Sequence, residues 1–454
     1  MNIIIVGCGK VGYALVEQLG NEEHNIVVID KNAKKVRSIT DVFDAMGVIG
    51  NGVSYQTLLE AGVSTADLVI SVTGSDEENL LCCLIAKKAG NCQTIARVRN
   101  PIYNAESDFL KEEFGLAMII NPELAAAMEI ARMFQFPSAI RVDTFAKGHV
   151  EMLHYKLPKD SPLVGIRLAD LYRKISVNIL IGEVIRNEEA IIPNGDFIFQ
   201  ENDIIATIST RKNALKFFKN IGLQKNPVKK VILAGGGKIS YYLAKSLILS
   251  GIHVTIFENN PERADFLSTE LPEATVILGD VTDLSLLSQE HYETADGFAC
   301  LTGFDEENIL LALHVNANSK AKTVTKINRI NFQNVIDQLD LGSIIYPRVT
   351  TAEYILKYVR SKSAAQQHNN IETLYKLANG KSEALEFNIT NRSEITDIPL
   401  QQLKIRKNTL IGCIYRSGKI IFPGGQDCIR VGDTVMVVLS GYCISNIEEI
   451  LEDS

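Results

Sequence analysis

The sequence predicts an α/β protein built from two tandem doubly wound parallel sheets, each followed by a small α+β module. Two observations lead to this prediction. A short apolar strand, a glycine-rich loop and a helical pattern open the chain at Ile3 and recur at Val231. Matching segments then keep a spacing of 228–230 residues over most of the 454-residue chain. So constant a shift indicates tandem duplication of one unit of about 225 residues.

The first part of each unit alternates short apolar strands with helical patterns. This order is typical of a parallel sheet that helices cover on both faces. In the first unit the expected strands are Ile3–Val6, Ile26–Ile29, Met46–Ile49, Leu68–Val72, Thr94–Val98 and Met118–Ile120. In the second unit they are Val231–Ala234, His253–Phe257, Thr275–Leu278, Gly297–Leu301, Lys322–Ile327 and Ser343–Tyr346.

The remainder of each unit consists of short β runs broken by turn segments such as Pro193–Asp196 and Pro423–Gly425. That pattern predicts small α+β modules. We expect four domains, at residues 1–135, 140–223, 228–360 and 371–454. The polar, unpatterned stretch Ser361–Asn370 is the expected linker within the second unit.

The opening loop has the spacing of a dinucleotide-binding turn, as in Rossmann-like domains. Gly7 permits the tight turn after the strand, Gly9 lets backbone N–H groups approach a pyrophosphate, and Gly12 lets the helix pack close to the strand. The helix N-terminus favours a phosphate group. Asp30 ends the next strand, where a carboxylate accepts hydrogen bonds from ribose hydroxyls and repels a 2′-phosphate. We therefore expect NAD-type nucleotides or adenine mononucleotides rather than NADP.

The second loop, Gly235-Gly236-Gly237-Lys238-Ile239-Ser240, predicts a second site of the same kind. Ser240 replaces the third glycine, and serine is small enough for the contact between helix and strand. Glu258 stands where the first unit has Asp30 and has one more methylene group with which to reach the ribose.

Polar residues also follow other strands at the carboxyl edge of each expected sheet, where ligands bind in open α/β folds. In the first unit these are Asn51, Thr73 and Arg97, and the charge of Arg97 could reach a phosphate. Each could instead be a surface or capping residue. The predicted nucleotide-binding set is Gly7, Cys8, Gly9, Lys10, Val11, Gly12, Asp30, Asn51, Thr73 and Arg97, with Gly235, Gly236, Gly237, Lys238, Ile239, Glu258, Asp280, Thr302 and Lys326 in the second unit.

Acidic clusters recur at equivalent places, as SDEENLL from Ser75 and FDEENIL from Phe304. Ser75 followed by acidic residues is typical of a helix N-terminus, because the hydroxyl caps a backbone N–H and the carboxylates suit the helix dipole. The alternative is a divalent-cation site. Sequence alone favours the capping interpretation.

Composition narrows the class of protein. The chain has 46 Lys+Arg against 54 Asp+Glu, a formal net charge of −8, which argues against nucleic-acid binding. It has no run of about 18 apolar residues that would span a membrane. The first strand begins too early for a secretory signal. Its eight cysteines form no C-x-x-C pair, so we expect reduced thiols, no metal site and a cytoplasmic location.

Catalytic groups are not evident in the sequence. A dehydrogenase needs an acid or base beside the nicotinamide, and none of the seven histidines recurs at equivalent positions in the later loops of the two units. Neither a GxxxxGK[ST] phosphate cradle nor a G-x-S-x-G elbow is present. The pattern favours a sensor, in which nucleotide binding biases a two-state assembly, over an enzyme.

Several motifs together resemble the TrkA family, the peripheral NAD-binding regulatory subunits of bacterial and archaeal Trk potassium uptake systems. They are GCGKVG, GNGVSYQTLLEAGVSTADLVISVT, ARVRNP and NPELAAAMEIAR in the first unit, and GGGKIS, GDVTDLSLL, LTGFDEEN and YPRVTTAEYI in the second. The resemblance covers essentially the whole chain. It implies two RCK (or KTN) domains, each with a Rossmann-like N-terminal part and a smaller C-terminal part.

The resemblance also implies ligands and partners. Family members bind NAD(H) and also ATP or ADP, and some relatives bind cyclic dinucleotides in the small modules. The N-terminal parts of several chains would form a gating ring, here a tetramer, on the inner face of the cell membrane beneath a dimeric TrkH/TrkG-type potassium transporter. By position, the residues of the predicted set would line the two nucleotide sites, and neither site would be catalytic.

Two other interpretations stay open. One is an NAD-dependent dehydrogenase with a degenerate second half. The other is a nucleotide-binding adaptor of another channel or exporter, which shares every sequence feature with the potassium-transport interpretation.

Overall fold

The computed structural model describes residues 1–20, 24–174, 177–223, 227–328, 333–336, 338–366, 371–377, 381–444 and 446–452. The chain divides into two compact units. Unit 1 combines Met1–Ala131 with Lys229–Leu356, and unit 2 combines Arg132–Val228 with Lys357–Ser454. Two of the crossings between units therefore fall inside helices, α7 (Pro122–Gln135) and α15 (Pro347–Gln366).

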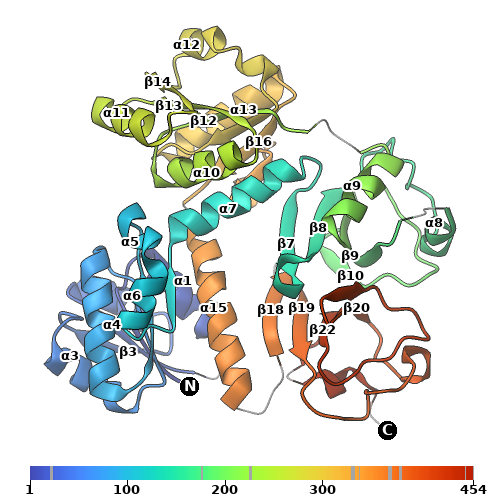
Figure 1. Ribbon diagram of the computed structural model, residues 1–454, viewed down its shortest axis with the longest axis horizontal. Coiled ribbons are helices and arrows are strands. Elements are labelled where there is room, and N and C mark those ends of the chain that lie inside the picture. Colours follow the sequence, from blue (N-terminus) through green and yellow to red (C-terminus); the bar gives the residue numbers. More distant parts are fainter. Residues whose placement is uncertain are drawn as a thin grey trace. The chain divides into compact units, whose positions relative to one another are not determined.

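The first half of unit 1, drawn in blue to cyan in Figure 1, is a six-stranded parallel sheet with the strand order β3-β2-β1-β4-β5-β6. The order reverses between β1 and β4, which is the switch point where ligands bind in open α/β sheets. The elements are β1 (Asn2–Val6), α1 (Lys10–Leu19), β2 (Asn25–Asp30), α2 (Ala33–Thr40), β3 (Met46–Ile49), α3 (Tyr55–Glu60), β4 (Leu68–Ser71), α4 (Asp76–Gly90), β5 (Gln93–Arg97), α5 (Pro101–Ala105), α6 (Ser107–Glu113), β6 (Met118–Ile120) and α7.

The second half of unit 1 repeats this plan with the order β14-β13-β12-β15-β16-β17, again with every pair of strands parallel. The elements are β12 (Lys230–Ala234), α10 (Lys238–Leu249), β13 (His253–Glu258), α11 (Pro261–Glu270), β14 (Thr275–Leu278), α12 (Leu284–Gln289), β15 (Gly297–Cys300), α13 (Asp305–Asn318), β16 (Lys322–Lys326), α14 (Gln333–Ile336), β17 (Ser343–Ile345) and α15.

The predicted fold class is confirmed, and each expected strand of unit 1 is present with ends that differ by no more than two residues. The apolar runs were informative because the central strands are covered on both faces. In β1 the side chains of Ile3 to Val6 are all buried, as are Leu15 and Leu19 on the inner face of α1.

Unit 2 contains two antiparallel sheets of five strands each, in the orders β10-β9-β11-β8-β7 and β18-β19-β22-β20-β21. The elements of the first are β7 (Arg141–Phe145), β8 (Val150–Lys156), α8 (Leu168–Lys174), β9 (Leu180–Arg186), β10 (Glu189–Ile191), β11 (Ile204–Ser209) and α9 (Arg211–Asn220). Those of the second are β18 (Ile371–Leu377), β19 (Ser382–Asn388), β20 (Thr409–Arg416), β21 (Lys419–Ile421) and β22 (Thr434–Ser440).

The two sheets of unit 2 share an apolar core. Met152 and Ile208 of the first sheet pack in one buried cluster with Ala384 and Val438 of the second. Hydrogen bonds also join the two sheets. The backbone N–H of Ala146 donates to Glu386 at 2.5 Å, and the Ser382 hydroxyl donates to Glu183. Because Glu183 is fully buried, its ionised form loses hydration, and burial raises the pKa of its carboxyl.

The expected linker at Ser361–Asn370 is wrong for its first part. Residues 361–366 continue α15, and 367–370 lie outside the described residues. The stretch Ser-Lys-Ser-Ala-Ala-Gln contains lysine, two alanines and glutamine, which are good helix formers even without an apolar stripe. A polar composition was therefore mistaken for a break in the helix.

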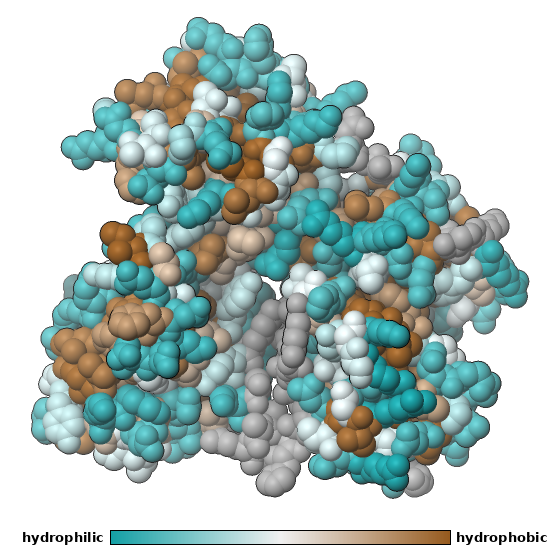
Figure 2. Space-filling view, viewed as in Figure 1, coloured by the Kyte–Doolittle hydropathy of each residue, from teal (hydrophilic) through white to brown (hydrophobic). Residues whose placement is uncertain are grey.

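The described helices include none that is both long and apolar enough to cross a membrane. The face of the molecule drawn in Figure 2 is largely hydrophilic, with smaller apolar patches. Large apolar side chains that are exposed on described parts of unit 1 include Met46, Ile102, Phe109, Leu249 and Leu310.

A buried glutamate in the first sheet of unit 2 makes its stability depend on pH. Glu151 of β8 lies opposite Ser209 of β11 and is only 9% exposed. Burial raises the pKa of its carboxyl from 4.5 to about 7, against the opposing attraction of Arg211 and Arg132. The folded state therefore binds the proton more tightly than the unfolded state. The tighter binding of the proton stabilises the folded state. This contribution to the free energy of unfolding is complete below the pKa of the unfolded state and is lost as the pH rises through the pKa of the folded state.

We expect Glu151→Gln to remove this loss and to stabilise unit 2 by up to about 3 kcal/mol at about pH 8, with little effect at about pH 4. Calorimetric unfolding at both pH values measures the difference. Glu201→Gln, at an exposed position of the same unit, is the control. A glutamine variant that is less stable than the parent at about pH 8 would contradict the assignment.

Candidate nucleotide-binding site

The loop that opens unit 1 needs glycine at two positions for different reasons. Gly7 has φ +107°, which L side chains rarely adopt, and a Cβ there would lie 3.0 Å from the backbone of Val72 and Thr73. A Cβ on Gly12 would lie 2.0 Å from the carbonyl oxygen of Gly7. Gly9, the N-cap of α1, has nothing within 4 Å of such a Cβ, so its backbone borders open space.

Asp30 at the end of β2 holds this loop. Its Oδ2 accepts a hydrogen bond from the backbone N–H of Cys8 at 2.9 Å, and its Oδ1 accepts one from Asn32 at 2.8 Å. Each carboxylate oxygen has further lone pairs with which to accept a ribose hydroxyl. The carboxylate therefore shapes the loop and also presents the acceptor that the sequence predicted.

A cavity of about 390 Å³ opens at the switch point between β1 and β4. Of the predicted set, Gly7, Gly9, Lys10, Val11, Asp30, Asn51, Thr73 and Arg97 line it, together with Val6, Ile29, Lys31, Lys35, Gly50, Gly52, Val53, Val72, Gly74, Glu78 and Cys82. The basic side chains among them suit an anionic ligand. Cys8 and Gly12 are not among the lining residues.

Cys8 contributes its backbone rather than its thiol. The residue is 6% exposed, and burial, followed by the nearby charge of Asp30, raises the pKa of the thiol to about 12. The thiol is therefore neutral at physiological pH. Gly12, the other predicted residue that does not line the cavity, only allows α1 to pack closely against the loop.

A buried asparagine that the sequence analysis did not single out connects the ends of β4 and β5. Asn79 of α4 accepts hydrogen bonds from the N–H and the hydroxyl of Thr73, both at 2.8 Å, and donates to the carbonyl of Arg97 at 2.9 Å. Asn308 makes the equivalent backbone bonds with Thr302 at 2.8 Å and Lys326 at 3.0 Å. The signal was present, since DEEN occurs in both units.

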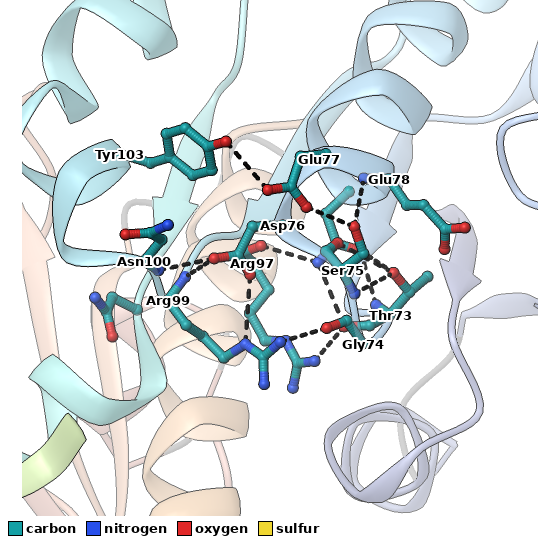
Figure 3. A network of polar contacts seen from close by, with 12 residues as sticks. Thr73, Gly74, Ser75, Asp76, Glu77, Glu78, Arg97, Arg99, Asn100 and Tyr103 are labelled. Carbon is teal, nitrogen blue, oxygen red and sulfur yellow. Dashed lines mark hydrogen bonds and ion pairs between the residues drawn. The ribbon is translucent and has the colours of Figure 1, made fainter. Parts of the chain in front are cut away.

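The acidic residues at the start of α4 act as capping and connecting groups. The Ser75 hydroxyl accepts from the N–H of Glu78 at 3.1 Å, which confirms the predicted N-cap (Figure 3). Asp76 accepts from the backbone N–H of Arg99 at 2.8 Å and of Asn100 at 2.7 Å. Among the described residues, no group of three or more His, Cys, Asp or Glu side chains is arranged to hold a metal ion.

Two arginines come from the end of β5 and lie side by side in Figure 3. Arg97 donates to the carbonyl of Thr73, and Arg99 donates to the carbonyl of Gly74 and pairs with Asp76 at 3.4 Å. Burial and the neighbouring charge of Arg99 lower the pKa of Arg97. Arg97 is among the residues that line the cavity, and Arg99 lies beside it outside that lining.

The second half of unit 1 places the predicted residues in the same arrangement. Gly235 has φ +99°, and the N–H of Gly236 donates to Glu258 at 2.8 Å. The Ser240 hydroxyl, in the position of Gly12, donates to the carbonyl of Gly235. Burial lowers the pKa of the Lys326 ammonium, which donates to the carbonyl of Leu301 at 3.1 Å.

The remaining members of the second set lie at the same edge of their sheet. Lys238 and Ile239 open α10, whose N-cap is Gly237. Asp280 follows β14 and accepts from the N–H and hydroxyl of Thr282, both at 2.8 Å. One detail differs from the first half: Phe304 stands where the first unit has Ser75, and it gives no side-chain cap.

Two cations near the ribose end of the loops were missed by the sequence analysis. Lys35 lines the first cavity from α2. Arg263 of α11 donates from Nε to the carbonyl of Gly236 at 2.8 Å. Both lie three residues after the asparagine that caps their helix, so the recurrence of a cation at this spacing was the available signal.

Comparison with known proteins identifies the family of the chain. The TrkA-N domain family matches residues 3–122 and 231–347, and the TrkA-C domain family matches residues 152–222. The chain is 31% identical over 452 residues to a Trk system potassium uptake protein TrkA homolog of Archaeoglobus fulgidus, covering 99% of this chain and 100% of that one.

The chain belongs to the TrkA family. It is also 30% identical to the Trk system potassium uptake protein TrkA of Haemophilus influenzae over 99% of this chain and 98% of that protein. The resemblance predicted from the motifs is thereby confirmed.

Solved structures support the fold of this TrkA-family chain. The GsuK channel bound to NAD has a TM-score of 0.62 and 16% identity, and the match covers 97% of this chain and 76% of that one. The GsuK RCK domain has a TM-score of 0.63 and 16% identity, covering 97% and 92%. At that identity the likeness establishes the shared fold.

Removing the buried asparagine of the first TrkA-N domain should loosen the edge of the sheet that carries Thr73 and Arg97. We expect Asn79→Ala to destabilise unit 1 by about 2–3 kcal/mol, because the buried Ser71 and the partly buried Thr73 and Arg97 lose their bonds. Denaturant unfolding measures the change. Asn79→Asp, of nearly equal size, should destabilise as well, since it cannot donate to the carbonyl of Arg97. A stable aspartate variant would show that this bond contributes little.

Proposed function

We propose that this TrkA-family chain is a nucleotide-sensing regulatory subunit that binds NAD(H), or ATP or ADP, and gates a membrane potassium uptake protein. The observation that carries the proposal is the pair of glycine loops in unit 1. Each turns a helix N-terminus toward the switch point of a parallel sheet, beside an acidic ribose acceptor and a basic side chain. That combination suits a nucleotide pyrophosphate.

In the first site we assign the phosphates to the N-terminus of α1, at Gly9, Lys10 and Val11. The ribose would bond to Asp30. Arg97, with its neighbour Arg99, would balance the charge of the phosphates. Asn51 and Thr73 line the same cavity and would contact the remaining edges of the ligand. The second site would use the corresponding residues Gly235, Gly236, Gly237, Lys238, Ile239, Glu258, Asp280, Thr302 and Lys326.

A regulatory role follows from the family and from the duplicated design. Relatives over the full length are named Trk system potassium uptake protein TrkA. A structure of similar fold is a channel bound to NAD, and another GsuK structure is bound to ADP. We therefore propose that neither site is catalytic, and that nucleotide binding shifts the population of two conformations of an assembly.

The partner and the assembly are part of the same proposal. The chain would work in the cytoplasm, on the inner face of the membrane, bound to a TrkH/TrkG-type potassium transporter, and would form a tetrameric gating ring. Its four domains, at residues 1–135, 140–223, 228–360 and 371–454, would act as two sensors and two assembly modules. An NAD-dependent dehydrogenase and an adaptor of another transporter are the competing functions.

Two glycine substitutions separate ligand binding from folding. Gly9→Ala should leave the melting temperature unchanged, since its Cβ meets nothing within 4 Å, yet weaken ADP binding by roughly tenfold because the methyl group enters the cavity. Gly12→Ala should instead destabilise unit 1 by about 1–3 kcal/mol, because its Cβ meets the carbonyl of Gly7. Calorimetry measures both quantities. Unchanged ADP affinity in Gly9→Ala would contradict the assigned phosphate position.

Potassium transport can be tested in cells. Uptake of rubidium at limiting external potassium should fall when the gene is deleted and return with the intact gene, but not with a Gly9→Val, Asp30→Ala version. Asp44→Ala, at an exposed position beyond α2, is the matched control and should restore uptake. Uptake that is unaffected by deletion would remove the proposed partner. Steady turnover of NADH with a small-molecule substrate would favour the dehydrogenase.

A further inference from the structure

The two halves of unit 1 differ in the helix that follows the ribose-binding acid. In the second half, α11 carries Arg263 and Phe266. The equivalent positions of α2, at an offset of 228 residues, carry Lys35 and Ser38. A planar cation beside an aromatic ring thus replaces an ammonium group beside a small hydroxyl. The difference lies next to the predicted nucleotide site and concerns its adenosine end.

Contacts on two sides fix the guanidinium of Arg263. Its Nε donates to the carbonyl of Gly236 at 2.8 Å, and its central carbon lies 4.6 Å from the centre of the Phe266 ring. The N–H of the same Gly236 donates to Glu258 at 2.8 Å. The guanidinium therefore lies beside the acid that is assigned to the ribose, and between the loop and the ring of Phe266.

This placement suits a base better than a phosphate. The phosphates have their own place at the N-terminus of α10, and the Glu258 carboxylate beside Arg263 would repel a phosphate group on the ribose. A guanidinium is planar and weakly hydrated, so it stacks on aromatic faces. Among the described residues, Arg263 makes no other hydrogen bond that would hold the plane elsewhere.

We propose that Arg263, supported by Phe266, is the group on which the adenine ring stacks in the second nucleotide site. This inference rests on the proposed function, and it gives a binding role to a residue outside the sequence motifs that predicted the site. The guanidinium of Arg263 would then lie between two π systems, the ring of Phe266 on one side and the adenine on the other. Partial burial, which lowers the pKa of Arg263, strengthens such a contact because less water competes for the charge.

A consequence is that the two sites recognise different parts of the same ligand. The first site has Arg97 in its lining, with Arg99 beside it, at the end that we assign to the phosphates, and it has Lys35 at the other end. The second has Lys326 at the phosphate end, with Asn328 in the position of Arg99. Affinity of the second site should therefore depend more on the base, and affinity of the first more on the phosphates.

Calorimetric titration of the full chain with the first site disabled by Gly9→Val and Asp30→Ala tests this inference. The probes are ADP and inorganic pyrophosphate, which has no base. Arg263→Lys keeps the charge but removes the plane, and we expect it to weaken ADP binding about tenfold while changing pyrophosphate affinity less than about twofold. Phe266→Leu should weaken ADP binding about threefold. Lys245→Ala, at an exposed position of α10, is the control and should change neither.

Each other outcome has a distinct meaning. ADP affinity that is unchanged in Arg263→Lys overturns the stacking contact and leaves the proposed function standing. Equal losses for ADP and pyrophosphate, in Arg263→Lys or in a further Arg263→Leu variant, would show that the residue binds phosphate and overturn the inference. ADP binding that is present in the intact chain but absent when the first site is disabled overturns both the inference and the sensing role of the second site.

Discussion

A carboxylate at the end of the second strand holds each glycine loop of unit 1. Asp30 and Glu258 accept a hydrogen bond from the second residue of their loops and another from the backbone two residues beyond themselves. The loops need this constraint because they begin with a glycine at positive φ, which has many alternative conformations in the unfolded chain. Once the loop is fixed, the helix N-terminus points at the switch point, and the cavity follows from that.

The duplicated halves keep the hydrogen bonds that hold the ends of the fourth and fifth strands and differ at the start of the helix between those strands. The asparagine that connects the fourth and fifth strands is retained as Asn79 and Asn308, and both bond to the same two backbone groups, an N–H after the fourth strand and a carbonyl at the end of the fifth. The helix cap, by contrast, changes from Ser75 to Phe304. Duplication within one chain would thus allow the two proposed nucleotide sites to acquire different specificity.

Unit 2 relies on buried acidic groups where unit 1 relies on backbone geometry. Glu151, Glu183 and Glu386 lie on strands whose other residues form an apolar core, and each is less than 10% exposed. Burying a carboxyl costs free energy unless it is bonded or protonated. The bonds from Ser382 to Glu183 and from Ala146 to Glu386 offset part of that cost, and they require one relative placement of the two sheets of the unit. An apolar contact alone would be less selective.

The sequence by itself determined the architecture of unit 1, the duplication and eight of the nineteen residues that line the cavity. Buried parallel strands appear in the sequence as apolar runs, and a loop residue at positive φ appears as glycine. Both signals are local, because they involve only neighbouring residues of the chain. Only the tertiary structure decided which side chains meet across the fold. In the sequence, Asn79 is one more polar residue at the acidic start of a helix. Its role in connecting the ends of β4 and β5 is visible only in the folded structure. The sequence alone would place Arg263 on the surface. In the structure α11 lies against the second loop, and Arg263 bonds to that loop. Such contacts depend on how elements pack, because residues far apart in the chain become neighbours only when the sheet is complete.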